Sequence, residues 1–471
     1  MKEIALDLIQ KYNWLVLLYF LGINGTYILL NILSFFAIKR YLKERKTTEL
    51  ERIFQSPFFE PISIIAPAYN EEETVVESAK ALLQLQYPQH EVVVVNDGSK
   101  DRTLKMLVER YKMVKAPITY PMQIDCKRIK QVYVSPEYPN LVLVDKENGG
   151  KGDAMNAGVN VSRYPLVCFI DADSLLEPDA LLKVVRPFLE DPTTIGVGGI
   201  VRIANGCKVK AGRVIEVGMA KNSLARFQIV EYLRAFLFGR TGWDILNGML
   251  IISGAFGLFS KKAVVECGGY RSDTVGEDME FTVRLHRIMR EKKRLYRITF
   301  IADPVCWTQV PEKLKILSGQ RNRWQRGLMD SMFFNMKMLF NPKYGIVGLF
   351  AMPFFFFFEM LGPIAEFTGY IVFFVSWYLN IVSFTFALFF LAAAIVLGII
   401  LSMGSLVLEE LSFRRYPKIL HLVILFAYAV LENFGYRQLN TWWRFKGCLD
   451  HILGKRGWGK MERKGFQAVK G

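Results

Sequence analysis

Several common signatures of metal, nucleotide and nucleic-acid binding are missing from this sequence of 471 residues. None of its six cysteines belongs to a CxxC pair, so we expect reduced thiols and neither disulfides nor a zinc site. The GxxxxGK[ST] spacing of a Walker P-loop is absent. No segment resembles a nucleic-acid-binding module, so nucleic acid is not an expected partner.

Charged residues are missing from several long stretches, although the chain carries a formal net charge of +16. Residues Tyr12 to Ile38 are uncharged and numerous enough to cross a bilayer of ~30 Å. The basic cluster Lys39 to Lys46 follows, and the positive-inside rule places that side in the cytoplasm. No small-residue cleavage site precedes it, so we expect a retained membrane helix and not a signal peptide. The excess positive charge suits either anionic lipids or an anionic substrate such as a nucleotide.

The C-terminal third also has long apolar runs. The uncharged run Phe367 to Leu408 is too long for one span and is interrupted by Asn380, which predicts a hairpin of two spans. Ile419 to Leu431 is a shorter run, and the basic tail Gly454 to Gly465 is expected to stay in the cytoplasm. The simplest count is four spans. If the N-terminus lies outside the cell and the tail lies in the cytoplasm, the number of membrane spans must be odd. One of the apolar segments is therefore expected to be interfacial or re-entrant.

Two glutamates interrupt the apolar stretch Gly345 to Leu379. Glu359 and Glu366 are seven residues apart and would share one helix face at membrane depth, where a charge is costly. They would line a polar path for the glycan, be paired internally or lie at the membrane interface.

The composition between Lys39 and Lys343 is that of a soluble α/β protein. Ile62 to Ala66 is an apolar run of the buried-strand type, followed by a turn and a helix with apolar residues from Val75 to Leu83. The strand Val92 to Val95 opens a second unit of this kind. Two strand-turn-helix units in series predict a parallel sheet, and such sheets bind ligands beyond the carboxyl ends of their strands.

Polar residues follow these strands where a ligand would bind. Tyr69 and Glu71 follow the first strand, and Asp97 follows the second. Their side chains would suit a base or ribose, although Asp97 would equally suit a helix cap. Farther along, Lys151 stands beside paired glycines, which let the backbone approach a ligand closely. A flexible surface loop is the alternative for that segment.

Two acidic motifs come next. A buried strand, Leu166 to Ile170, ends in Asp171-Ala172-Asp173, and two carboxylates at one strand end suit Mg²⁺ or Mn²⁺. Gly276-Glu277-Asp278 precedes a helical pattern, so its acids would supply a general base or merely suit the helix dipole.

These motifs precede Gln320-Arg321-Asn322-Arg323-Trp324, and the whole ordered set carries a resemblance. From about Pro61 to Gly327 the sequence resembles the membrane-integrated family 2 glycosyltransferases, which include cellulose, chitin, hyaluronan and poly-N-acetylglucosamine synthases. The resemblance implies a GT-A fold, an α/β nucleotide-sugar-binding domain, attached to α-helical membrane spans. It also implies a UDP-sugar donor, a Mg²⁺ or Mn²⁺ ion, and a single displacement that inverts the anomeric centre.

The resemblance also implies a role for each motif. Asp97 would read the uracil, Asp173 would bind the metal, and Asp278 would be the catalytic base. The residues implied in donor binding are Tyr69, Glu71, Asp97, Lys151 and Asp171. An arginine fork matches phosphate oxygens and an indole offers a flat face to a sugar ring. Gln320, Arg321, Arg323 and Trp324 would therefore serve the diphosphate and the acceptor. An amphipathic helix at lipid headgroups is the alternative for this last motif.

Three features depart from the family pattern. Asn96 stands where the family has the first acid of its DDG motif, and Ile252 to Ala255 stands where several synthases carry a cysteine motif. Residues 113–140 look like an insertion between core strands. These departures concern the substrate and not the reaction.

The resemblance thus implies an inverting membrane-bound glycosyltransferase that uses UDP-GlcNAc or UDP-glucose to extend a polysaccharide processively and is coupled to its export. The expected partners include the lipid bilayer and accessory export subunits. A non-processive transferase with a lipid-linked acceptor is the alternative, and a non-catalytic membrane scaffold or transporter is a third reading. The predicted parts are an N-terminal transmembrane helix with its basic flank (1–45), a cytoplasmic GT-A domain (46–315), interface helices (316–344), C-terminal transmembrane helices (345–440) and a basic cytoplasmic tail (441–471).

Overall fold

The structure, a computed structural model, describes residues 2–47, 59–455 and 457, apart from residues 118, 211, 380, 382 and 417. The predicted break at Asn380 and most of the basic stretch Gly454 to Gly465 therefore lie outside the described residues. The chain divides into two compact units. We call Tyr41–Ala220 with Met249–Val310 the sheet unit, and Met1–Arg40 with Lys221–Gly248 and Pro311–Lys460 the helical unit.

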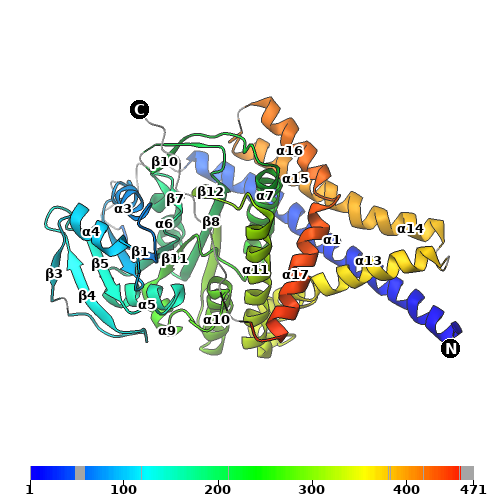
Figure 1. The fold of residues 1–471 in the computed structure, drawn as a ribbon, viewed down its shortest axis with the longest axis horizontal. Helices are drawn as coiled ribbons and strands as arrows, with labels where there is room; N and C mark the ends of the chain where they lie inside the picture. Colours follow the sequence, from blue (N-terminus) through cyan, green and yellow to red (C-terminus); the bar gives the residue numbers. More distant parts are fainter. Residues whose placement is uncertain are drawn as a thin grey trace. The chain divides into compact units, whose positions relative to one another are not determined.

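The sheet unit is built on ten strands in the order β3-β4-β5-β2-β1-β6-β11-β8-β12-β7 (Figure 1). Their bounds are β1 Ile62–Ala68, β2 His90–Asn96, β3 Val114–Ala116, β4 Ile129–Val134, β5 Leu141–Lys146, β6 Leu166–Ile170, β7 Leu175–Leu176, β8 Thr194–Ile203, β11 Phe256–Ser260 and β12 Arg297–Thr308. A separate hairpin joins β9 (Lys208–Lys210) to β10 (Arg213–Glu216).

Four neighbouring strands, β5, β2, β1 and β6, run parallel, as the sequence predicts. Their carboxyl ends therefore meet at one edge of the sheet. The next strand, β11, is antiparallel to β6, and its first residue, Phe256, pairs with Ile170 at the end of β6. The residues just before β11 thus reach the same edge. The segment 113–140 contributes β3 and β4, which extend the sheet antiparallel to β5.

The helices of the sheet unit are α3 Val75–Leu83, α4 Thr103–Arg110, α5 Lys151–Val161, α6 Ala180–Glu190, α9 Lys261–Glu266 and α10 Glu277–Glu291. Helix α5 is buried along nearly its whole length, from Gly152 to Val161. Gly158 lets it approach β1, because a Cβ atom at this position would lie 2.4 Å from Cγ2 of Ile65. The close approach holds the start of α5 beside the carboxyl ends of the strands.

The helical unit contains α1 up to Arg40, with the whole helix running over Lys2–Thr47. Its other helices are α7 Ser223–Tyr232, α8 Thr241–Ile245, α11 Leu314–Phe334, α12 Met352–Phe354, α13 Gly362–Tyr378, α14 Phe384–Leu391, α15 Leu397–Ser412, α16 Ile419–Leu431 and α17 Tyr436–Ile452. Four π-helical segments join some of these: η1 Leu233–Arg240, η4 Val347–Ala351, η5 Phe355–Met360 and η6 Ala392–Val396. Two short 3₁₀ turns, η2 Met336–Met338 and η3 Pro342–Tyr344, follow α11.

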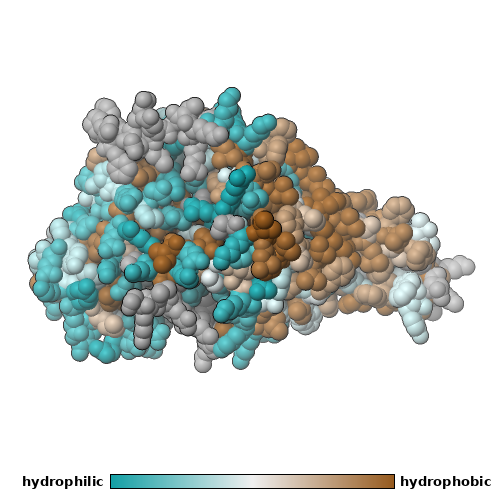
Figure 2. Space-filling view, turned by 90° about the horizontal axis from the view of Figure 1, so that it is seen from above, coloured by the Kyte–Doolittle hydropathy of each residue, from teal (hydrophilic) through white to brown (hydrophobic). Residues whose placement is uncertain are grey.

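Two helices of the described chain, Leu6–Lys43 and Phe384–Ser412, are long and apolar enough to cross a membrane. Two bent pairs would bring the number to four if each pair forms one span. These are Val347–Met360 with Gly362–Tyr378, bent by 42°, and Ile419–Leu431 with Tyr436–Ile452, bent by 58°. Hydrophobic side chains gather over the surface of the helical unit (Figure 2). The four spans predicted from the sequence agree with the larger number, in which each bent pair counts as one span.

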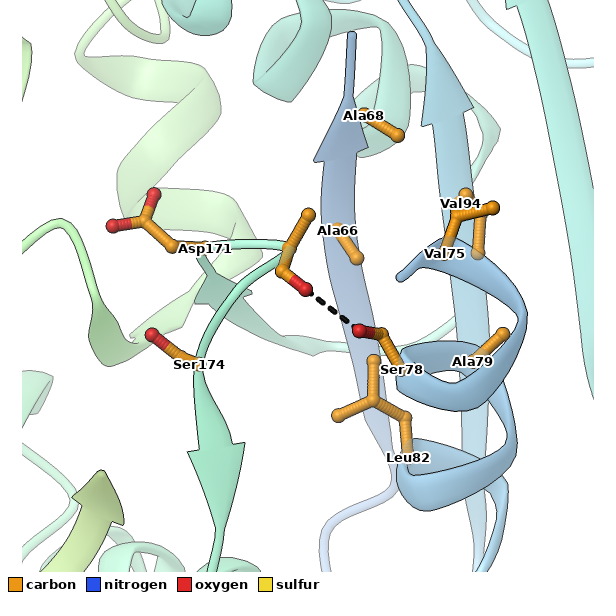
Figure 3. Close-up of a pocket in the computed structure, with 10 residues that line it drawn as sticks. Ala66, Ala68, Val75, Ser78, Ala79, Leu82, Val94, Asp171 and Ser174 are labelled. Atoms are coloured by element: carbon orange, nitrogen blue, oxygen red, sulfur yellow. Dashed lines mark hydrogen bonds between the residues drawn. The ribbon is translucent and has the colours of Figure 1, made fainter. Parts of the chain in front are cut away.

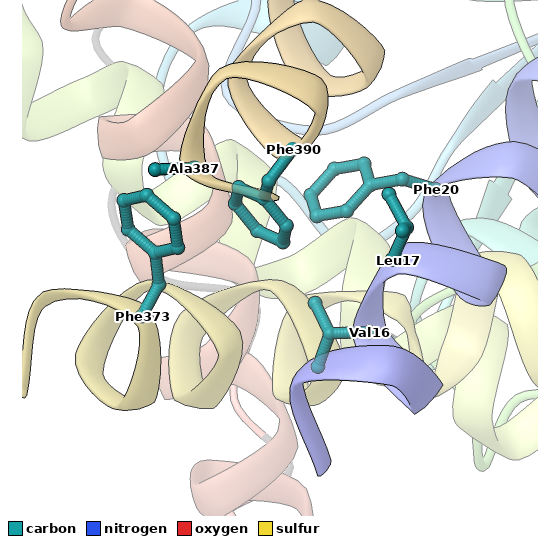
Figure 4. Packing of buried hydrophobic residues seen from close by; sticks show 6 residues of the cluster. All are labelled: Val16, Leu17, Phe20, Phe373, Ala387 and Phe390. Atoms are coloured by element: carbon teal, nitrogen blue, oxygen red, sulfur yellow. The ribbon is translucent and has the colours of Figure 1, made fainter. Parts of the chain in front are cut away.

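An aromatic core joins α1 to α13 and α14 (Figure 4). Val16, Leu17 and Phe20 of α1 pack in one buried cluster with Phe373, Ala387 and Phe390. The rings of Phe373 and Phe390 stack with centroids 4.6 Å apart. Helices α13 and α14 are therefore packed neighbours, as the predicted hairpin requires.

The two glutamates of the apolar stretch are paired internally. Arg444 of α17 donates to Oε2 of Glu359 (3.2 Å), and the hydroxyl of Tyr27 donates to the other oxygen of that carboxylate. Thr441, also on α17, donates to Glu366 (2.7 Å). Of the possibilities the sequence leaves open, the structure shows the internal pairing, which offsets the cost of burying these charges.

The close approach of α5 to β1 gives a first prediction. Gly158→Ala should lower the midpoint of thermal unfolding, since the added methyl group overpacks the contact with Ile65, at a cost of about 1–3 kcal/mol. Gly319→Ala on α11 is the control, because a Cβ atom there meets nothing within 4 Å. It should leave the midpoint unchanged or raise it. Equal midpoints for the Gly158→Ala variant and the wild type would contradict the packing argument.

Candidate active site

The carboxyl edge of the parallel strands collects most of the predicted site residues. Asp97 follows β2, Lys146 ends β5, and Asp171 follows β6. Lys151 is the first residue of α5, and Asp278 lies in the first turn of α10. All of these belong to the sheet unit. The chain therefore brings acids and cations from five separate elements to this unit's carboxyl edge.

Asp97 is buried, and its carboxylate accepts three hydrogen bonds. Oδ1 accepts hydrogen bonds from Nζ of Lys146 (2.7 Å) and from the backbone N–H of Gly149 (2.9 Å). Oδ2 accepts from the backbone N–H of Gly150 (2.8 Å). With the Asp97 residue only 3% exposed, its carboxylate faces the glycine loop.

The residues after β1 divide into one exposed and one buried side chain. Tyr69 is 44% exposed, so its ring is accessible. Glu71 is buried, and its carboxylate accepts a hydrogen bond from the Thr74 hydroxyl (3.0 Å). Its backbone N–H donates to the hydroxyl of Thr103 (2.8 Å). Glu71 therefore secures the turn that leads into α3.

Lys151 connects the acids that follow β6 with those that begin α10. Its ammonium lies 2.5 Å from Oδ1 of Asp171 and 3.2 Å from Oε1 of Glu277. Burial lowers the pKa of the Lys151 ammonium, but the attraction of Asp171 and Glu277 outweighs this and raises the pKa above its ordinary value. Lys151 therefore stays charged at neutral pH.

Glu277 and Asp278 are the first two residues of α10, where the helix dipole favours negative charge. Burial raises the pKa of the Glu277 carboxyl, Lys151 opposes this, and neighbouring Asp278 adds to it, with a raised pKa as the net result. Asp278 is only half-buried. Its Oδ2 accepts from the N–H of Gly254 (2.9 Å), and its Oδ1 accepts from the N–H of Met279 (2.8 Å). Asp278 is thus the better exposed of the two acids, and two backbone N–H groups orient its carboxylate.

The Asp171-Ala172-Asp173 turn is anchored from behind. The hydroxyl of Ser78 on α3 donates to the carbonyl of Ala172 (2.7 Å), at the rim of a small cavity (Figure 3). Apolar side chains of β1 and α3 line that cavity, and Asp171 points away from them (Figure 3). The hydrogen bond from Ser78 therefore anchors the turn, and the cavity beside it is too apolar to bind a diphosphate.

The same turn has the donor chemistry of a Mg²⁺ or Mn²⁺ site. Asp171 and Asp173 are both half-buried and offer hard carboxylate oxygens. No group of three or more metal-binding side chains is found in the described part of the chain. Mg²⁺ is often bound by one or two carboxylates together with substrate phosphates, so two acids fit an ion that arrives with a diphosphate.

The Gln320 to Trp324 motif belongs to the helical unit, on α11. Arg321 is buried, and its Nη2 donates to Oε2 of Glu231 on α7 (2.7 Å). The hydroxyl of Tyr436 on α17 donates to the same oxygen (3.0 Å). The guanidinium of Arg321 also lies 4.2 Å from the ring centroid of Trp324. Arg321 therefore joins three helices of its own unit.

The other members of this motif differ in exposure. Trp324 is 42% exposed, whereas Arg323 is 9% exposed and Gln320 is intermediate. The next residue, Gln325, is buried and accepts a hydrogen bond from Arg444 (3.0 Å). The accessible ring of Trp324 stands on a helix whose buried face is held by polar contacts. The roles predicted for Gln320, Arg321, Arg323 and Trp324 stay predictions.

Sequence reasoning passed over three residues that the structure places in the cluster. Nζ of Lys146 lies 2.5 Å from Oδ1 of Asp153. These two residues flank the glycine pair that precedes Lys151. Gly254 contacts the cluster through its backbone. Its N–H donates to Asp278 and its carbonyl lies 3.4 Å from Nζ of Lys151. Only the concentration of charge around the glycine pair could have pointed to the first two residues.

Comparison with known families identifies the chain. The family described as "Glycosyl transferase family group 2" matches residues 166–401, half of the chain, and the family described as "Glycosyl transferase family 2" matches residues 63–264. The chain therefore belongs to the family 2 glycosyltransferases. The predicted family and the predicted α/β fold class with long apolar helices are both confirmed.

Individual relatives are similar to this chain over part of its length. The poly-beta-1,6-N-acetyl-D-glucosamine synthase of Staphylococcus aureus (strain COL) is 29% identical over 290 residues, which is 60% of this chain and 60% of that protein. The synthase of the same name from Staphylococcus epidermidis is 29% identical over 269 residues, 57% of this chain and 54% of that protein. The chain thus spans about 60% or less of the curated relatives it matches.

A solved structure is also similar. The mannosyltransferase PcManGT from Pyrobaculum calidifontis, in complex with GDP-Man and Mn²⁺, has a TM-score of 0.48 and 19% sequence identity. The match covers 88% of this chain and 99% of that one.

The tight packing at Gly254 gives the second prediction. A Cβ atom there would lie 2.8 Å from Nζ of Lys151 and 3.4 Å from Oδ2 of Asp278. Gly254→Ala should therefore displace the lysine and lower the turnover number about 10- to 100-fold, the scale of a 1 Å misplacement. Ser260→Ala, at the far end of β11, is the control, because that side chain makes no capping hydrogen bond. Wild-type turnover in the Gly254→Ala enzyme would show that Gly254 does not shape the site.

Proposed function

We propose that this chain transfers a sugar from a UDP-sugar to a growing glycan, with inversion at the anomeric carbon. The observation that carries the proposal is the position of Lys151 between Asp171 and Glu277, beside Asp278. A cation, metal-type acids and a candidate base meet where open α/β sheets bind their ligands. Family membership limits the reaction to glycosyl transfer, and these groups match its charge requirements.

In the proposed reaction, different residues serve as the base, stabilise the leaving group and bind the donor. The acceptor hydroxyl has a pKa far above 7, so Asp278 takes its proton as it attacks the anomeric carbon. The leaving UDP carries the developing negative charge, which the Lys151 ammonium stabilises. A Mg²⁺ or Mn²⁺ ion held by Asp173 and Asp171 would supply further stabilisation of that charge. Tyr69, with its exposed ring, is the candidate wall for the uracil.

The donor we favour is UDP-N-acetylglucosamine, with UDP-glucose as the competing substrate. The support is the shared name of the relatives from two staphylococci, both poly-beta-1,6-N-acetyl-D-glucosamine synthases. We further propose a multi-pass protein of the plasma membrane with its sheet unit in the cytoplasm, where UDP-sugars are found. The uncharged run of α1 and the basic cluster after it support this orientation.

The test is UDP release by the purified full-length protein with each of several UDP-sugars, combined with sizing of the product. We expect release with UDP-N-acetylglucosamine and a long product. A single added sugar on a lipid would favour the non-processive alternative. No UDP release with any UDP-sugar would refute the proposal.

The role of Asp278 gives the third prediction. Asp278→Asn keeps the size of the side chain but removes the base, so turnover should fall by roughly 10²–10⁴-fold while UDP affinity stays close to that of the wild type. Asp273→Asn is the control, since Asp273 is an exposed acid that lies five residues before Asp278 and pairs with Arg271. If the Asp278→Asn enzyme turns over normally, the base lies elsewhere.

The exposed indole gives the fourth prediction. Trp324→Ala should abolish chain elongation yet keep UDP affinity and hydrolysis of the donor by water, because a flat apolar face serves the acceptor ring. Phenylalanine at this position should restore part of the elongation. Trp442→Ala is a matched control, since Trp442 on α17 is 43% exposed in the same unit. Normal elongation in the Trp324→Ala enzyme, or loss of UDP binding, would rule out an acceptor platform.

A further inference from the structure

We infer that Thr282 and His286 of α10 are positioning residues for the proposed base. They hold residues 249–254, the segment that leads into β11, against α10, so that Gly254 aims the carboxylate of Asp278. The inference rests on the proposed role of Asp278 in glycosyl transfer. It assigns a function to two buried polar side chains that the reaction itself does not use.

Three polar side chains on one face of α10 bind the backbone of this segment. Asp278, Thr282 and His286 are spaced by four residues, so they lie one above another along the helix. The N–H of Gly254 donates to Oδ2 of Asp278 (2.9 Å), and the N–H of Ile252 donates to the Thr282 hydroxyl (3.4 Å). His286 contacts the first residue of the segment. The segment and α10 therefore run side by side in opposite directions.

The imidazole of His286 has a defined tautomer. Burial lowers its pKa to about 4, and the charge of Arg290 adds to this, so the ring is neutral at neutral pH even though its bond to Met249 raises the pKa. A carbonyl can only accept, so Nε2 carries the hydrogen and donates to the carbonyl of Met249 (2.9 Å). Nδ1 then accepts from the hydroxyl of Tyr296 (2.8 Å). The ring is thus held on both sides.

The hydroxyl of Thr282 makes two hydrogen bonds. It accepts the N–H of Ile252 and donates to the backbone carbonyl of Asp278 (2.9 Å). Residues 250–254 belong to no helix or strand, so their backbone groups have no partners in a sheet ladder. Buried backbone groups need such partners, and side chains of α10 supply them here. Thr282 therefore connects the segment directly to the start of α10.

The other side of the segment is fixed by packing. Ile252 is buried, and its side chain lies against glycines of β8 and β11. A Cβ atom on Gly257 would lie 2.6 Å from Cγ2 of Ile252, and one on Gly198 would lie 3.4 Å from Cγ1. These glycines leave the room that Ile252 fills. The segment is therefore held between α10 and the sheet.

The position of the segment matters because Gly254 contacts two charged side chains of the site. Its N–H donates to Asp278, and its carbonyl lies 3.4 Å from Nζ of Lys151. Lys151 is also held by its ion pairs with Asp171 and Glu277. Loss of the segment's position should therefore misdirect the carboxylate of Asp278 and leave the lysine in place.

The experiment measures UDP release from UDP-N-acetylglucosamine by the full-length protein and its Thr282 variants. Thr282→Val keeps the shape of the side chain but removes the hydroxyl. It should lower the turnover number about tenfold or more, the scale of a misplaced reacting group, while KM for the donor stays close to the wild-type value. Thr282→Ser keeps the hydroxyl and should restore most of the turnover.

The control for these variants is Ser63→Ala. It removes another buried hydroxyl, which donates to Glu91 (2.6 Å) near the amino end of β1. This variant should keep wild-type turnover even if its midpoint of thermal unfolding falls as far as that of Thr282→Val. Wild-type turnover in the Thr282→Val enzyme would overturn the inference.

A double-mutant cycle separates positioning from a general loss of stability. In an enzyme that already carries Asp278→Asn, the further change Thr282→Val should cause no additional loss of turnover, because Thr282 acts through the base. A loss of the same size as in the wild-type background would mean that Thr282 acts independently of Asp278, and the inference would be wrong.

Two amide replacements test His286. Glutamine places its amide nitrogen near the position of Nε2 and can still donate to Met249, whereas asparagine reaches only as far as Nδ1. We expect His286→Gln to keep most of the turnover and His286→Asn to lose about tenfold. Equal losses in the two variants would show that the imidazole serves packing alone.

Hydrogen exchange of the Gly254 amide gives a readout that needs no activity. Thr282→Val and His286→Asn should both speed this exchange, and Ser63→Ala should leave it unchanged. Unchanged exchange in the first two variants would overturn the inference. A wild-type protein that releases no UDP with any UDP-sugar would refute the proposed function instead, and the exchange measurement would still decide whether Thr282 and His286 hold the segment.

Discussion

Acids that converge on one edge of a sheet repel one another, and the sheet unit keeps them together by burying lysines among them. Lys146 lies between Asp97 and Asp153, and Lys151 lies between Asp171 and Glu277. Each unpaired carboxylate would be costly at this depth, because attraction to a cation has to offset its loss of water. The loops after β5 and β6 and the start of α10 owe their positions to these pairs.

In the helical unit, arginines pair with the acids. Arg321 pairs with Glu231, Arg444 with Glu359, and the guanidinium of Arg234 contacts the carboxylate of Glu432. Each pair links two segments of the unit that are far apart in the sequence, so it helps to specify which helices pack together. The buried face of α11 is held in this way, while Trp324 on the same helix stays accessible.

Part of this arrangement could be read from the sequence, and the reason is physical. Strands buried on both faces read as continuous apolar runs, so Leu166–Ile170 and the cores of β1 and β2 were predictable, and so were the acids that follow them. The role of Lys146 was not, because a lysine at a strand end usually faces water and its partner Asp153 reaches it only through the packing of α5. The partners of Arg321 and Glu359 were hidden for the same reason, since they stand on helices far away in sequence.

We propose that the lysines and acids at the carboxyl edge of the sheet bind a nucleoside diphosphate together with a divalent ion. Calorimetric titration of UDP into the wild-type protein, once in Mn²⁺ and once in EDTA, tests it most directly. We expect saturable binding of UDP in Mn²⁺ and a loss of affinity of about tenfold or more in EDTA, because the ion neutralises charge that Lys151 alone does not. Equal affinity in the two buffers, or no binding of UDP in either, would contradict it.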